Sequence, residues 1–90
     1  MQWHVLPGDL VGRFVQMHTK YDLLKSNGQF VSVDRNGETT TGTWSLIDGQ
    51  FTSKDSEGKM WMQGPVSPFR EGFFIEYKEG YHTGFYRSED

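Results

Sequence analysis

The three histidines of this 90-residue chain, His4, His18 and His82, are the residues best suited to bind a metal ion or a haem. They lie far apart in the sequence and lack the i, i+4 spacing that places two imidazoles on one helical face. A zinc or haem site would require His18 and His82 on the same side of the fold. The spacing alone does not establish that arrangement, so we expect no metal and no cofactor.

Catalysis by a nucleophile is not indicated by the residue types present. The chain has no cysteine, which excludes a thiolate nucleophile, a disulfide and a metal site with cysteine ligands. Its carboxylates fall almost entirely in turns, where they assist turn formation and solubility. No nucleophile stands beside a base, and no glycine-rich loop precedes a helix. We therefore expect a protein that is not an enzyme.

The segment Lys59–Gln63 has the most unusual composition, because Met60, Trp61 and Met62 are consecutive. If it is a strand, strict alternation places Met60 and Met62 on one face and Trp61 on the other. In one interpretation Trp61 covers a sheet edge or packs under the loop at residues 65–69. In the other, exposed Trp61 forms an apolar patch for a partner or ligand with Phe69 and with Phe73 or Phe74, and the two methionines form pocket walls.

The elements that must position these residues are strands joined by tight turns. Asp48-Gly49 between two β-forming runs predicts a two-residue type I′ hairpin, since both residues can adopt positive φ. That turn pairs Leu46 with Phe51 and places Trp44 on the same face. We expect this face to line the core.

A second hairpin is predicted around Ser26-Asn27-Gly28, and its register depends on loop length. A three-residue loop pairs Leu23 with Val31 and Tyr21 with Val33, so four apolar side chains share a face. A two-residue loop would mix polar and apolar residues on both faces, and a slip of one residue exchanges the faces. We therefore prefer the longer loop. The predicted core is Tyr21, Leu23, Val31, Val33, Trp44, Leu46 and Phe51.

Turn glycines recur at intervals typical of short antiparallel strands. They predict an all-β fold, a small antiparallel up-and-down barrel of seven or eight strands, because closure removes exposed sheet edges. The only helical signal is a turn before Leu10. We expect a lead-in at residues 1–9, one barrel domain at residues 10–87 and a tail at residues 88–90. Two prolines predict irregular structure at residues 64–72.

Size and charge limit the range of functions. A chain of 90 residues forms one domain with a thin core, so any interior cavity must be small. A net charge of −3 argues against binding to nucleic acid or to an anionic membrane surface. No signal peptide or long apolar run is present, so we expect a cytoplasmic protein, or a periplasmic or secreted one if the sequence is a mature fragment.

Two short motifs resemble those of bacterial lipocalin-like (calycin-type) domains. They are Leu10-Val11-Gly12-Arg13-Phe14 and Gly42-Thr43-Trp44, and a closing Gly84-Phe85-Tyr86-Arg87 accompanies them. The resemblance implies a barrel with one closed end, where Arg87 packs over Phe14 in a cation–π contact. Phe14 stands where that family usually has Trp. Trp44 belongs to the same structural set. The hairpin motifs also resemble MORN-type or antitoxin-type β-hairpin repeats, although the glycine spacing is unequal.

The lipocalin-like resemblance implies non-catalytic binding of a small apolar ligand in the open end of the barrel. We expect the contacts to come from Met60, Trp61, Met62, Phe74 and Tyr86. The alternative is a protein-interaction module, a homodimer or an inhibitor, that uses exposed aromatic side chains and a sheet edge.

Overall fold

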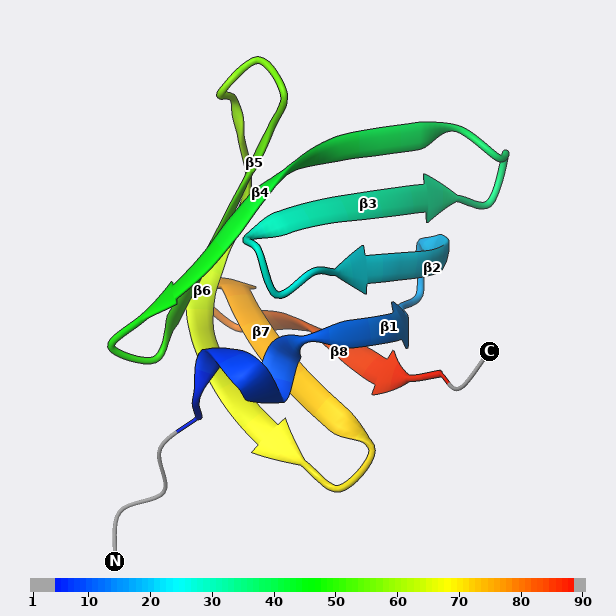
Figure 1. Ribbon diagram of the computed structural model, residues 1–90. Helices are drawn as coiled ribbons and strands as arrows, with labels where there is room; N and C mark the ends of the chain where they lie inside the picture. Colours follow the sequence, from blue (N-terminus) through cyan, green and yellow to red (C-terminus); the bar gives the residue numbers. More distant parts are fainter. Residues whose placement is uncertain (1–4, 89–90) are drawn as a thin grey trace, which may run out of the picture.

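The chain forms a closed antiparallel barrel in which each strand pairs with its neighbours in sequence and the last pairs with the first (Figure 1). The computed structural model describes residues 5–88. Trp3 and His4, the start of the predicted lead-in and the last two residues of the predicted tail lie outside the described residues. The eight strands are β1 (Gly12–Val15), β2 (Thr19–Leu24), β3 (Gln29–Asp34), β4 (Thr39–Ile47), β5 (Gln50–Asp55), β6 (Met60–Phe69), β7 (Gly72–Lys78) and β8 (Tyr81–Arg87).

The predicted all-β barrel is therefore confirmed, with eight strands. The helical turn expected before Leu10 is present as the 3-10 helix η1 (Pro7–Leu10). Its last residue, Leu10, is fully buried. Within residues 5–88, no helix has the length and apolar character needed to cross a membrane.

The two hairpin registers predicted from the sequence are both correct. Asp48 and Gly49 have φ values of 52° and 77°, and the flanking strands pair Leu46 with Phe51. In the other hairpin the strands pair Leu23 with Val31, as the three-residue loop requires. Gly28 at the end of that loop has a φ of 88°.

The irregular segment predicted at residues 64–72 is instead mostly strand, so that prediction was wrong: residues 64–69 belong to β6, residues 70–71 form a turn and Gly72 begins β7. The residues up to Pro65 pair with β5, and those from Val66 onward pair with β7. Pro65 thus lies where the strand changes its partner. The amide of Val66 donates to the Gly49 carbonyl at 2.9 Å. Pro68 is two residues after Val66, so its nitrogen points to the same side of β6. On that side β5 has not yet begun, so the missing N–H of Pro68 removes no hydrogen bond between strands.

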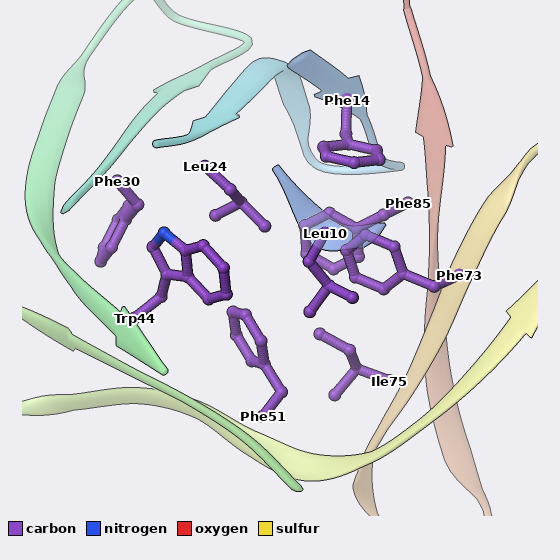
Figure 2. Packing of buried hydrophobic residues seen from close by; sticks show 9 residues of the cluster. All are labelled: Leu10, Phe14, Leu24, Phe30, Trp44, Phe51, Phe73, Ile75 and Phe85. Carbon is purple, nitrogen blue, oxygen red and sulfur yellow. The ribbon is translucent and has the colours of Figure 1, made fainter. Parts of the chain in front are cut away.

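The core is a cluster of nine side chains contributed by η1 and seven of the strands. Figure 2 shows them pointing towards one another: Leu10, Phe14, Leu24, Phe30, Trp44, Phe51, Phe73, Ile75 and Phe85. Phe73 and Phe85 stack at 4.8 Å between ring centroids, and Phe14 meets Phe73 edge-on at 5.0 Å. The buried indole of Trp44 donates to the Lys25 carbonyl at 3.0 Å. Aromatic rings therefore fill this narrow barrel.

The predicted core was right for one hairpin and wrong for the other. Trp44 and Phe51 are buried, and half-buried Leu46 packs against the cluster. By contrast, the outer-face residues of β2 and β3 are only half-buried, namely Tyr21, Leu23, Val31 and Val33. The inner face there carries Leu24 and Phe30, and also Asp22 and Ser32. The apolar alternation follows the outer surface at this point because the barrel interior becomes polar.

One end of the barrel is closed by Arg87. Its guanidinium carbon lies 4.7 Å from the centroid of the Phe14 ring, so the contact predicted from the resemblance is present. Its Nη1 donates to the Val11 carbonyl at 3.0 Å and its Nη2 to the Asp9 carbonyl at 2.8 Å. These bonds attach the chain entering β1 to the end of β8.

Candidate ligand cavity

The other end of the barrel carries polar side chains inside and an open cavity at its margin. Phe14 pairs with Asp22 across β1 and β2, so both side chains point inward. Two residues beyond Phe14, Gln16 is also buried. The interior thus changes from aromatic to polar within one strand, and the change begins where β1 ends.

The polar side chains form one hydrogen-bonded chain. Asp22 is 4% exposed, and its Oδ2 accepts from Thr19 Oγ1 at 2.7 Å and from Gln16 Nε2 at 3.2 Å. Gln16 Oε1 in turn accepts from Thr83 Oγ1 at 3.2 Å. Three side chains, Gln16 after β1, Thr19 in β2 and Thr83 in β8, are therefore linked around the buried carboxylate of Asp22. Such bonds compensate for the loss of water around it.

A cavity of about 530 Å³ opens beside this chain, and we call it the rim cavity. Its walls come from the turn after β1, from the start of β6, and from β7 and β8. They are Gln16, Met17, His18, Trp61, Met62, Phe74, Tyr77, His82, Thr83, Gly84 and Tyr86. The volume lies in the range of ordinary small-molecule sites, about 300–1,000 Å³.

A much smaller space of about 20 Å³, the inner void, lies further inside the barrel. It is bounded by Gln16, Asp22, Leu24, Phe30, Phe51, Ser53, Trp61, Met62 and Phe85. Gln16, Trp61 and Met62 line both spaces, so these three side chains separate the rim cavity from the inner void. The inner void has room for about one water molecule. The inner void is thus far smaller than the rim cavity, because the aromatic core fills most of the barrel.

The strict alternation predicted for Met60, Trp61 and Met62 was wrong. Ser53 pairs with Met62 and the next residue, Lys54, pairs with Met60, which makes Trp61 the extra residue of a β-bulge. A bulge turns two consecutive side chains towards the same side of the sheet. Trp61 and Met62 both line the rim cavity, whereas Met60 is half-exposed on the outer face and does not line it.

Four of the five residues expected to contact a ligand therefore line one cavity, namely Trp61, Met62, Phe74 and Tyr86. Trp61 also packs on core residue Phe30 with 5.5 Å between ring centroids, although 46% of its surface is exposed. Phe14, Arg87 and Trp44 lie away from the cavity, in the closed end and the core.

The sequence analysis missed three buried polar residues, Gln16 in the wall of both spaces and Asp22 and Ser53 in the wall of the inner void only. A signal for them was present. Gly42 lies two residues from inward-facing Trp44 and therefore on the same face, and its partner across the strands is Phe30. Ser32, two residues after Phe30, shares that face, and Ser32 pairs with Asp22. Following the register across strands would have placed Asp22 inside.

The structure brings His18 and His82 to the walls of the same cavity. The ring of His82 meets Phe74 edge-on at 5.2 Å. Among residues 5–88, however, no group of three or more His, Cys, Asp or Glu side chains is arranged to hold a metal ion. Both histidines lie in the wall of the rim cavity.

Comparison of the chain with protein-family models, with curated proteins and with solved structures finds no match. Kinship with the lipocalin-like domains therefore remains a proposal. Its support is the motif residues themselves, the closed eight-stranded barrel and the Arg87–Phe14 contact.

Proposed function

We propose that this protein binds a small, largely apolar molecule in the rim cavity and does not alter it chemically. The observation that carries the proposal is the cavity of about 530 Å³ with Trp61, Phe74, Tyr77 and Tyr86 in its walls. Aromatic walls with a few polar groups at defined points are typical of small-molecule sites. Here the polar groups are at the floor, where Gln16 and Thr83 are hydrogen-bonded to each other.

Met17 and Met62 add to this the ability to accept ligands of different shapes. Both line the cavity, and 71% of the surface of Met17 is exposed. A thioether side chain is flexible and polarisable, so it can adjust to an irregular apolar surface. The proposed ligand is therefore an apolar body of modest size that contacts aromatic rings and methionines.

The proposal can be tested by nuclear magnetic resonance with 2-phenylethanol as the probe. We expect saturable shifts of the amides of Met62, Thr83 and Gly84, with a dissociation constant on the order of 1 mM for so small a molecule. Trp61→Ala should weaken binding about tenfold, because an aromatic wall is lost. Met60→Ala is the matched control: it is the neighbouring residue, is similarly exposed and lies outside the cavity.

Native mass spectrometry of protein purified from cells provides a second measurement. We expect a co-purified adduct on the wild-type protein that Trp61→Ala reduces. The proposal fails if no adduct is present and the probe produces no saturable shifts at the cavity walls.

A second candidate function is self-association through an aromatic cluster on the outer face of β6, β7 and β8. Phe69 lies 4.4 Å from Phe74 and 5.3 Å from Tyr86, measured between ring centroids. Tyr86 is 51% exposed. Because every strand of the closed barrel has two partners, this candidate depends on the aromatic cluster and not on a sheet edge.

Sedimentation velocity over a range of concentrations tests this candidate. A homodimer would give a sedimentation-derived mass of twice the chain mass of 10.4 kDa. Tyr86→Ser should shift the equilibrium from the dimer towards the monomer. A single species at the chain mass at every concentration would exclude it.

A further inference from the structure

The inner void has a charged wall that the proposed apolar ligand does not explain. Asp22 is almost completely buried, and the two side chains that donate to its Oδ2 are both neutral. Ser53, 5% exposed, adds a hydroxyl group to the same wall. A buried carboxylate is stabilised much more by a cation than by neutral dipoles. The inner void is therefore the place in the barrel where a ligand cation would be most favourable.

The two spaces have the sizes that one molecule with a small charged group would need. The rim cavity of about 530 Å³ accommodates an apolar body, and the inner void of about 20 Å³ accommodates a group the size of water. A primary ammonium group has about that size and presents three hydrogen-bond donors. A trimethylammonium group is several times larger and would be stopped at Gln16, Trp61 and Met62.

The electrostatics of the walls favour a cation over an anion. No Lys or Arg is among the described wall residues of either space. Trp61 lines both, so a cation moving from one space to the other passes an indole ring, which attracts positive charge. The protein as a whole carries a formal charge of −3.

We infer that the ligand is a primary amine with an apolar body, whose ammonium group occupies the inner void beside Asp22 while its body occupies the rim cavity. This inference rests on the proposed function, since it names the chemical class of the molecule bound there. The ammonium donates to the Asp22 carboxylate, and the Ser53 hydroxyl and the Gln16 side chain complete its surroundings. No bond is made or broken.

The first test compares three probes that share one apolar body, using wild-type protein and calorimetry or magnetic resonance. The probes are 2-phenylethylamine as its ammonium salt, 2-phenylethanol and the N,N,N-trimethyl derivative of the amine. We expect the primary amine to bind at least tenfold more tightly than either of the others. This ratio reflects a hydrogen bond between charged groups that the alcohol and the bulky cation do not make.

The outcomes separate the inference from the proposed function. If amine and alcohol bind equally, the inference is overturned and the proposed function stands. If the trimethyl derivative binds as tightly as the primary amine, the cation does not enter the inner void and the inference is again overturned. If none of the three binds, both fail.

The second test uses substitutions in the void. Asp22→Asn keeps the size of the side chain, and it should remove the advantage of the amine while leaving the affinity for the alcohol unchanged. Glu57→Gln is the control, because it changes the net charge equally at an exposed turn residue outside both spaces. Wild-type amine affinity in Asp22→Asn would overturn the inference.

A third substitution protects the test against loss of folding in Asp22→Asn. Ser53→Thr keeps the hydroxyl group and adds one methyl group to the wall of the inner void. We expect at least a tenfold loss of affinity for the amine and no change for the alcohol, because only the ammonium group needs the space. Unchanged amine binding in this variant would also overturn the inference.

Discussion

At the scale of single residues, the closed end depends on the space that Gly12 leaves for Arg87. Gly12 has a φ of 140°, and a Cβ atom there would lie 2.6 Å from Nη1 of Arg87. Arg87 uses that position to bond two carbonyls and to cover the Phe14 ring. The glycine is thus required both by its backbone conformation and by the side chain above it.

Gly12→Ala should lower the free energy of unfolding by about 2 kcal/mol, because it strains the backbone and displaces the guanidinium group. Equilibrium unfolding in urea measures the loss. Gly58→Ala is the control: its φ is also positive, at 85°, but no heavy atom lies within 4 Å of the added Cβ. It should cost less than Gly12→Ala, and equal losses would show that the contact with Arg87 contributes nothing.

At the scale of elements, the β-bulge in β6 decides the composition of the rim cavity. Without the extra residue, Trp61 would alternate away from Met62. With it, Trp61 and Met62 both face the cavity and Met60 faces outward. Alternation predicts such faces only for regular strands. A bulge depends on pairing with β5, which is a long-range property, so Lys59–Gln63 alone did not reveal it.

The same limit explains the inverted faces of β2 and β3. The local pattern determined their register correctly, because Tyr21, Leu23, Val31 and Val33 do share one face. It did not determine which face points inward. The face of a hairpin that points into the barrel depends on the other strands that complete the barrel. The buried polar residues near the cavity oppose the usual rule that the apolar face lies inside.

Two hairpin turns share the same side-chain support, in which an aspartate caps the turn. Oδ1 of Asp34 accepts from the amides of Asn36 and Glu38 at 2.8 and 2.9 Å. Oδ1 of Asp55 accepts from the amides of Glu57 and Lys59, each at 2.9 Å. The side chain thus replaces backbone partners that a tight turn leaves without bonds.

Asp34→Ala and Asp55→Ala should each lower the free energy of unfolding by about 1 kcal/mol. Each substitution removes the acceptor of two exposed backbone amides, which then bond to water instead. Chemical denaturation measures the change. Asp34→Asn and Asp55→Asn keep an oxygen at the same place and should lose much less. If alanine and asparagine variants were equally stable, the capping bonds would not contribute to stability.

At the scale of the whole molecule, the barrel is a meander closed by one long-range pairing. Seven of the strand pairs join neighbours in sequence, and turn chemistry predicted the β2–β3 and β4–β5 pairs together with their registers. The eighth joins β1 to β8 through only the pairs Phe14–Arg87 and Val15–Tyr86. Forming the β1–β8 pair brings together two ends of the chain that are separated by almost its full length, which carries an entropic cost of loop closure. The side chain of Arg87 adds two hydrogen bonds and a ring contact at this seam.

We therefore expect the β1–β8 seam to open locally before the barrel unfolds. Amide hydrogen exchange should give a lower opening free energy for Ser88, which donates to the Arg13 carbonyl at 2.9 Å, than for Trp44, which donates to the Gly28 carbonyl at 2.8 Å. Arg87→Met should lower it further for Ser88 and for the β1 amides. The amide of Trp44 should change only by the global loss of stability. Equal opening free energies at the two amides would contradict this expectation, because the barrel would then open only as a unit.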